Sequence, residues 1–185
     1  HEALGVDFPP VKERFERLEE ALVICRGMFR GERPTVDGRH YRVKDAVNSP
    51  APITPGGPPI MIGGGGEKKT LRLVAQYADA TNVFGGPETI HHKYEVIREH
   101  CAAIGRDPDE IERSTLQSVK LAIDGVPGES PGQVIDRFGE LADAGAQHVI
   151  FGVRATRASG AVDLSDSRCN LRVAIGSRTG AASPF

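Results

Sequence analysis

Four consecutive glycines, Gly63 to Gly66, lie in the stretch PPIMIGGGGEKKTLRLVAQYAD, between an apolar run and an amphipathic segment. Where a parallel strand ends in a glycine turn and a helix begins, unpaired backbone N–H groups and the positive end of the helix dipole point to the same place. A phosphate group satisfies both, and glycines let it approach the backbone closely. Lys68 and Lys69 would add positive charge, whereas the carboxylate of Glu67 would oppose an anion unless it turns away. The run therefore predicts a phosphate site.

A tight turn with positive φ angles and solvated lysines is the simpler alternative, but one or two glycines would suffice for it. The standard nucleotide motifs do not fit this run. The GxGxxG pattern fails because Lys68 stands where the third glycine belongs, and the P-loop pattern fails because Glu67 follows Gly66. The sequence thus favours a phosphate site of another kind over a Rossmann or kinase-like site.

Histidines elsewhere in the chain do not predict a metal site. His91 and His92 are adjacent in a predicted helix, where neighbouring side chains point about 100° apart and cannot chelate one ion. Both are expected on a solvated surface. For His40, which lies in a loop, ordinary packing is favoured over contact with a substrate.

Cysteine and acidic side chains also have ordinary structural explanations. Cys25 and Cys101 fall on apolar helical faces, so burial is expected for both. Glu19 and Glu20 are expected on a solvated helix face. No carboxylate pair and no Ser-His-Asp set is placed for catalysis, so the catalytic residues stay unknown. Any chemistry is expected to belong to a cofactor.

The elements that must position the glycine run alternate between helix and strand. Apolar residues at spacings of three and four predict helices at 11–30, 70–78, 87–104 and from 131 onward. Short apolar runs predict strands at 58–62, 80–85, 116–124 and 147–151. A further short strand is expected within GRHYRVKDA, and Ser130 and Pro131 are a typical N-cap and first helical residue. This alternation indicates an α/β fold with a parallel sheet, either open and doubly wound or part of an eight-stranded β/α barrel.

Composition and charge limit the class of protein. The 185 residues are 39% hydrophobic and 26% charged, which is typical of a soluble globular protein of one domain. A net charge of -2 gives no electrostatic reason to expect nucleic acid or an anionic membrane as a partner. No apolar run approaches the roughly 20 residues of a membrane span. The three cysteines lie far apart without a CxxC pair, which favours a reducing cytoplasm over disulfides or zinc.

The two ends of the chain depart from a regular pattern. The chain begins at His1 without an initiator methionine, in a loop-like stretch, so a fragment of a longer protein is expected. From Ala155 to Phe185 the sequence is rich in Ser, Arg, Gly and Ala without a sustained period. Residues 155–185 are therefore an unassigned tail, and residues 1–154 form the regular part.

Three segments, HEALGVDFPPVKERFERLEEALVICRGMF, SPAPITPGGPPIMIGGGGEKKTLRLVAQYADATNVFG and HKYEVIREHCAAIGRDPDEIERS, resemble the luciferase-like monooxygenase superfamily, and more narrowly its F420-dependent oxidoreductase subgroup. The resemblance implies that 1–154 is the C-terminal portion of a luciferase-like (β/α)8 TIM barrel, incomplete in this chain. It also implies FMN or coenzyme F420 at the C-terminal face. The cofactor's phosphate region would contact Gly63, Gly64, Gly65 and Gly66, and less directly Glu67 and Lys68.

The function that the resemblance implies is hydride transfer between a deazaflavin, or FMN, and a small organic substrate. Its residues for the flavin ring would lie in a preceding half of the barrel. Two alternatives stay open: a non-catalytic fragment, and a phosphate-binding β/α-barrel lyase or isomerase. The expected partner is a small-molecule substrate, not nucleic acid or a membrane, and a homodimer is a further possibility.

Overall fold

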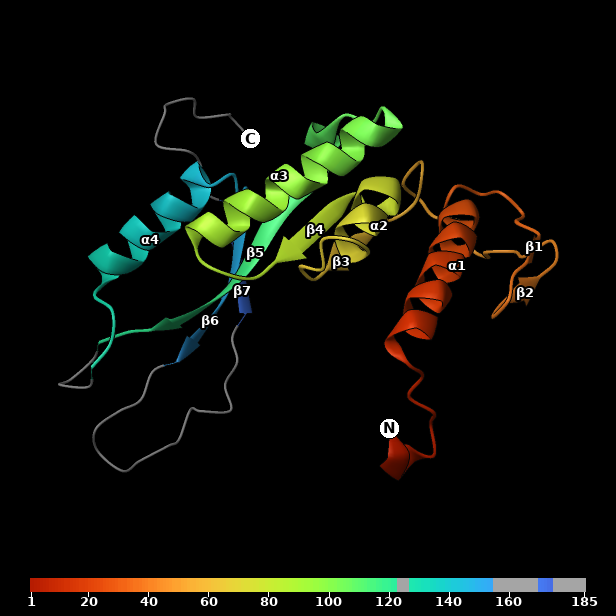
Figure 1. The fold of residues 1–185 in the computed structure, drawn as a ribbon, viewed down its shortest axis with the longest axis horizontal. Coiled ribbons are helices and arrows are strands. Elements are labelled where there is room, and N and C mark those ends of the chain that lie inside the picture. Colours follow the sequence, from red (N-terminus) through yellow and green to blue (C-terminus); the bar gives the residue numbers. More distant parts are fainter. Residues whose placement is uncertain (123–126, 155–169, 175–185) are drawn as a thin grey trace. The chain divides into compact units, whose positions relative to one another are not determined.

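The computed structural model describes residues 1–122, 127–154 and 170–174 (Figure 1). Within it the chain divides into two compact units, His1–Ile60 and Met61–Phe185, which are described separately. The second unit contains the glycine run, so its sheet and helices are the elements that position the predicted site.

The first unit is built from one long helix and a short hairpin. After the 3-10 turn η1 (Glu2–Leu4), α1 spans Val11–Phe29, which confirms the helix predicted for 11–30. Strands β1 (Val36–Asp37) and β2 (Arg42–Val43) pair antiparallel, and β2 confirms the short strand expected in GRHYRVKDA. The prediction for Cys25 was wrong: its side chain is exposed, because the covered part of α1 is formed by Leu22, Ile24 and Gly27.

The second unit alternates strands and helices along the chain. Its elements are β3 (Met61–Gly63), α2 (Thr70–Tyr77), β4 (Ala80–Val83), α3 (Pro87–Ile104), η2 (Pro108–Glu110), β5 (Glu112–Lys120), α4 (Pro131–Asp143), β6 (His148–Arg154) and β7 (Asn170–Ala174). The five strands form one sheet in the order β3-β4-β5-β6-β7. Neighbours from β3 to β6 run parallel, whereas β7 runs antiparallel to β6.

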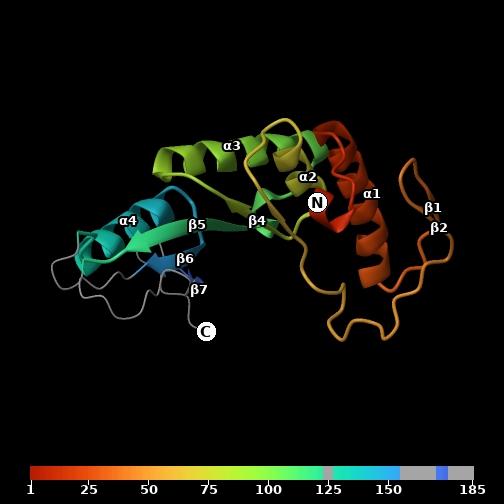
Figure 2. The same cartoon turned by 90° about the horizontal axis from the view of Figure 1, so that it is seen from below.

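The core of this unit lies between the sheet and its helices. Figures 1 and 2 show α2, α3 and α4 on one face of the sheet. Strand residues on that face are fully buried, among them Val83, Thr115 and Val149. From the helix side, Leu71 and Tyr94 are buried against them, and the Tyr94 hydroxyl donates to the carbonyl oxygen of Ser114 at 3.2 Å. The packing of apolar helix faces onto a parallel sheet is that of an α/β protein.

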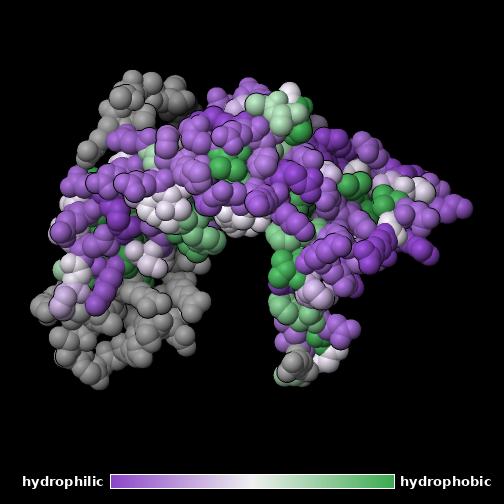
Figure 3. Space-filling model, viewed as in Figure 1, coloured by the Kyte–Doolittle hydropathy of each residue, from purple (hydrophilic) through white to green (hydrophobic). Residues whose placement is uncertain are grey.

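The opposite face of the sheet follows from the strand register. Gly63, Asn82, Ser114 and His148 are register partners in one row across β3 to β6. Two residues on this face, Met61 and Leu116, are 44% and 39% exposed. By contrast, the solvent side of α3 is mostly hydrophilic in the space-filling view (Figure 3), as expected for a helix that buries only one stripe.

Helix α4 begins as its sequence predicts. Ser130 is the N-cap and Pro131 the first helical residue, and the Ser130 hydroxyl accepts from the backbone N–H of Gln133 at 3.2 Å. The Gln133 side chain returns the contact by accepting from the N–H of Ser130 at 2.8 Å. This reciprocal capping box satisfies two donors that the helix leaves unpaired.

Strand β5 begins four residues before its predicted start. The strand was predicted to begin at Leu116, whereas it spans Glu112–Lys120. The N–H of Glu112 bonds to the carbonyl oxygen of Asp79, and the following residues pair with β4. The polar residues 112–115 are therefore in a strand because they pair with β4, not because of their composition.

The fold confirms the predicted class. The sheet is parallel from β3 to β6, is covered by helices on one face and, among the described residues, does not close into a barrel. Of the predicted tail, residues 155–169 and 175–185 lie outside the described residues, and 170–174 form β7. The end of the strand predicted for 116–124 also lies partly outside them, at 123 and 124.

Candidate functional site

The glycine run forms a turn at the carboxyl end of β3. Gly63 is the last strand residue and pairs with Asn82 of β4. Gly64 has a φ of 117°, a conformation that L side chains rarely adopt, and its N–H donates to the carbonyl oxygen of Asn82 at 2.9 Å. The turn therefore lies at the rim of the sheet where ligands of parallel α/β proteins bind.

A series of backbone donors follows this turn. Among the described residues, no acceptor is found for the backbone N–H groups of Gly65, Gly66, Glu67 and Lys68. Helix α2 begins at Thr70, and no side chain caps its N-terminus. Of the backbone amides of residues 64–68, that of Gly64 alone bonds to an acceptor within the described part of the chain. The arrangement thus offers adjacent donors next to the positive end of a helix dipole.

The side chain of Thr70 lies against the turn and limits which residues fit at positions 64 and 66. A Cβ atom at Gly66 would lie 2.9 Å from Thr70 Oγ1, and one at Gly64 would lie 3.4 Å from Thr70 Cγ2. A Cβ at Gly65 would lie 3.6 Å from Lys93 Cε, and one at Gly63 would meet nothing closer than 3.8 Å. The glycines at 64 and 66 are therefore required by backbone conformation and space, whereas Gly63 and Gly65 leave the backbone accessible.

Glu67 turns toward α3. Its Oε1 atom accepts from His92 Nε2 at 3.0 Å and forms an ion pair with Lys93 Nζ. Its backbone carbonyl oxygen accepts from His100 Nε2 at 2.8 Å. Hydrogen bonds from Lys93 and then His92 lower the pKa of Glu67 below its ordinary value, against a smaller opposing effect of burial. The carboxylate that the sequence placed in opposition to an anion is thus held ionised and paired.

The predicted site residues Gly63 to Lys68 lie together in this one turn, with Lys68 and Lys69 exposed beside it. Lys93 and His100 were not among the predicted site residues, and His92 was predicted only as a surface residue. The signal that could have found them is their position on one helix, since 93 and 100 are seven residues, about two turns, apart. A phosphate group of a deazaflavin or flavin fits this turn, because the four donors are adjacent and the first two, at Gly65 and Gly66, have no Cβ atom beside them.

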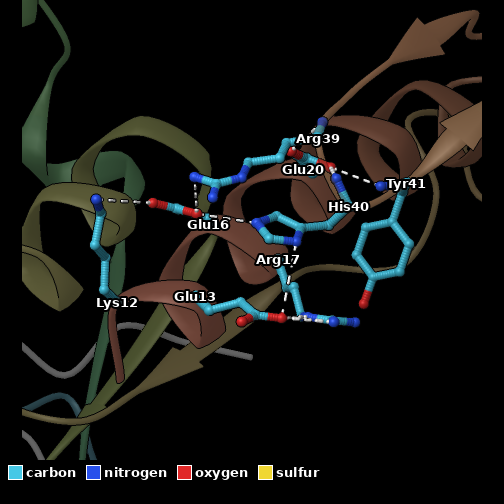
Figure 4. Close-up of polar contacts among 8 residues, drawn as sticks. All are labelled: Lys12, Glu13, Glu16, Arg17, Glu20, Arg39, His40 and Tyr41. Atoms are coloured by element: carbon cyan, nitrogen blue, oxygen red, sulfur yellow. Dashed lines mark hydrogen bonds and ion pairs between the residues drawn. The ribbon is translucent and has the colours of Figure 1, made fainter. Parts of the chain in front are cut away.

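A second polar cluster lies in the first unit and joins the hairpin to α1 (Figure 4). The carboxylate of Glu20 accepts three backbone N–H groups, from Arg39 at 2.9 Å, His40 at 3.0 Å and Tyr41 at 2.8 Å. The ring of His40, only 9% exposed, bonds through Nε2 to Glu16 Oε2 at 2.9 Å. His40 therefore packs, as favoured, but the prediction of a merely solvated Glu20 was wrong, because the hairpin turn bonds to it.

The described residues contain no group of three or more His, Cys, Asp or Glu side chains that could hold a metal ion. Nor does any helix in the described part of the chain combine the length and apolar character needed to cross a membrane.

Comparison with solved structures identifies the fold. An F420-dependent secondary alcohol dehydrogenase in complex with an F420-acetone adduct superposes with a TM-score of 0.69 at 16% identity, covering 82% of this chain and 59% of the other. The coenzyme F420 dependent tetrahydromethanopterin reductase from Methanopyrus kandleri gives a TM-score of 0.64 at 15% identity, covering 77% and 57%. At these identities the likeness establishes the shared architecture of luciferase-like barrels, of which this chain has a part.

Sequence relatives are closer. The F420-dependent glucose-6-phosphate dehydrogenases of Microbacterium testaceum (strain StLB037) and Mycobacterium leprae (strain Br4923) are 34% and 32% identical to this chain, over 64% and 66% of its length. The matches cover 35% and 36% of those proteins, so the chain spans about a third of the length of these curated relatives. The sequence model of the luciferase-like monooxygenase family matches residues 1–124, two thirds of the chain. The resemblance drawn from the glycine run and its flanking segments is confirmed: the chain belongs to the luciferase-like monooxygenase family.

Proposed function

We propose that this chain anchors the phosphate-bearing part of coenzyme F420 in an oxidoreductase that transfers a hydride between the deazaflavin and a small organic substrate. One observation carries the proposal: the backbone donors of Gly65 to Lys68 have no acceptor among the described residues and lie at the carboxyl rim of a parallel sheet. The relatives named F420-dependent glucose-6-phosphate dehydrogenase support F420 over FMN, which stays the alternative within the family.

The role of this chain's residues in that reaction is to bind and orient. The amides of Gly65, Gly66, Glu67 and Lys68 would donate to phosphate oxygens, with the exposed Lys68 adding charge nearby. When bound, the deazaflavin supplies the hydride chemistry. Since hydride transfer needs close, face-on placement of donor and acceptor, a fixed phosphate anchor lowers the cost of reaching that geometry.

We also propose the extent of the barrel in this chain, its cellular location and its oligomeric state. Residues 1–154 form the C-terminal half of the luciferase-like barrel, and the catalytic residues lie outside the groups assigned here. Free thiols at Cys25 and Cys101 support a reducing, cytoplasmic location. A homodimer stays a prediction, and light scattering coupled to size-exclusion chromatography measures it directly.

Fluorescence titration of the protein with F420, FMN and inorganic phosphate tests the cofactor assignment. We expect F420 to bind at least tenfold more tightly than inorganic phosphate, since about 1.4 kcal/mol from contacts with the rest of the cofactor's tail gives that ratio. Tighter binding of FMN than of F420 would select the alternative cofactor. Binding of phosphate alone would favour a phosphate-binding lyase or isomerase, and binding of none of the three would favour a non-catalytic fragment.

A further inference from the structure

We infer that three side chains of α3, Lys93, His92 and His100, hold the glycine turn in its anion-binding form by fixing Glu67. The inference rests on the proposed function, because it concerns the same turn. It assigns positioning residues that lie outside the glycine run and come from the following strand–helix unit.

Glu67 is held at both of its acceptor groups. His92 and Lys93 bind the carboxylate, while His100 binds the backbone carbonyl of the same residue at 2.8 Å. Since Glu67 is the third of the four residues with unpaired amides, contacts at its side chain and carbonyl fix the peptide planes on either side of it. The direction in which the neighbouring N–H groups point is thereby set by α3.

Lys93 also contacts the turn at a second place. Its Cε atom lies 3.6 Å from where a Cβ of Gly65 would stand, so the apolar stem of the lysine covers one side of that glycine. Its side chain is 19% exposed, less than that of its partner Glu67. Lys93 therefore supports the turn through packing at Gly65 and through the ion pair at Glu67.

The charge of Glu67 makes this support necessary. A carboxylate beside donors that bind phosphate would repel the ligand and compete for the same N–H groups. Pairing with Lys93 neutralises it and keeps it on the α3 side of the turn. The contacts therefore do two things for the anion site: they fix its backbone and they remove an opposing charge.

Isothermal titration with inorganic phosphate tests the role of Lys93. We expect Lys93→Met to weaken phosphate binding about five- to tenfold, the effect of losing one partly exposed charge-assisted contact. Lys93→Arg, which restores the charge, should recover most of the affinity. Phosphate affinity unchanged in Lys93→Met, with only the melting temperature lowered, would overturn the inference.

A double variant separates a positioning residue from a direct ligand. In a Glu67→Gln background, Lys93→Met should have little further effect on phosphate affinity, because Lys93 acts through Glu67. An undiminished effect in that background would show that Lys93 touches the anion itself and would overturn the positioning role.

The adjacent histidines provide a matched control. His92 contacts Glu67, whereas His91 faces Glu95 at 3.8 Å, so His92→Gln should weaken phosphate binding and His91→Gln should not. Equal effects of the two variants would contradict the inference.

The same variants titrated with F420 separate this inference from the proposed function. If phosphate binding changes as expected but F420 does not bind, only the cofactor assignment is refuted. If F420 binds and its affinity is the same in all α3 variants, only the positioning role is refuted.

Discussion

At the scale of single residues, two adjacent glycines of the turn differ in what they require. Gly64 needs glycine because of its backbone conformation, whereas Gly63 has room for a side chain. Gly64 has a φ of 117°, which strains any L residue, whereas Gly63 is extended strand with nothing within 3.8 Å of its missing Cβ. We therefore expect Gly64→Ala to lower the free energy of unfolding by about 1–3 kcal/mol and to weaken phosphate binding. Gly63→Ala should change stability by less than about 1 kcal/mol.

Urea unfolding and phosphate titration of the two variants measure this difference. Because both substitutions add the same methyl group one residue apart, each serves as the control for the other. Equal losses of stability in Gly63→Ala and Gly64→Ala would contradict the assignment of the strained position.

Glu20 gives a prediction for pH. Burial alone would raise the pKa of Glu20, but backbone N–H groups of Tyr41, His40 and Arg39 lower it below its ordinary value of 4.5. A carboxyl whose pKa is depressed in the folded state stabilises that state above its unfolded pKa, and the stabilisation is lost as the pH falls through the folded pKa. The hairpin is therefore expected to detach from α1 only at pH values below 4.5.

The amide resonances of Arg39, His40 and Tyr41 report this event in an NMR titration. We expect them to shift together with one midpoint below pH 4.5, and the common shift to vanish in Glu20→Gln. A midpoint above 4.5, or an unchanged titration in the variant, would show that Glu20 is not the group on which the turn depends.

The sequence could locate the candidate site but not the side chains that support it. Four glycines between an apolar run and a helix identify a turn because glycine has an unusual backbone range, a local property. The direction of Glu67 depends on Lys93, 26 residues further along, and on how α3 packs. The same holds for Glu20, which meets a turn about 20 residues away. Such pairings depend on tertiary structure, so the spacing of residues in a short stretch of sequence does not predict them.

At the scale of elements, the start of α4 depends on its capping box. Ser130→Ala removes the hydroxyl that accepts from Gln133 and should lower the free energy of unfolding by about 1 kcal/mol. Ser130→Thr keeps an acceptor oxygen and should cost only a few tenths of a kcal/mol. Chemical denaturation of both variants measures the effect, and equal losses would indicate that the hydroxyl contributes nothing.

Helices were predicted more closely than strands, and β5 shows why. The spacing of apolar residues in α3 and the proline that begins α4 are local signals, which can be recognised from a short stretch of sequence. The first half of β5 has the sequence Glu-Arg-Ser-Thr, without the apolar run that predicts a strand. Ser114 and Thr115 are nevertheless fully buried, because β4 and β6 flank them. Pairing with the neighbouring strands, and not amino-acid composition, therefore determines where β5 begins.

At the scale of the whole molecule, the loop before the second unit is the place where a protease should cut first among the described residues. Ile53 is fully exposed, with a relative accessibility of 102%. Between residues 47 and 59, one backbone–backbone hydrogen bond is found among the described residues, from the N–H of Gly57 to the carbonyl oxygen of Thr54. Exposed backbone with few hydrogen bonds is the preferred substrate of proteases.

Brief digestion with subtilisin under native conditions, followed by mass spectrometry, tests this. We expect the earliest cut within the described residues to fall between 51 and 57, while α1 and α3 stay intact. Digestion of the heat-unfolded protein is the control and should cut throughout. An early cut inside α3 would contradict the prediction that the loop is the most accessible part of the described backbone.

The reversed direction of β7 has a consequence for how the sheet can be completed. A (β/α)8 barrel closes when every strand has a parallel neighbour on each side, and the outer hydrogen-bonding groups of β6 are already engaged by a strand of opposite polarity. A further parallel strand can therefore pair directly with β3, whereas parallel pairing with β6 requires that β7 first leave it. The parallel part of the sheet can therefore be extended at β3, whereas at β6 the antiparallel strand β7 occupies the position of the next barrel strand.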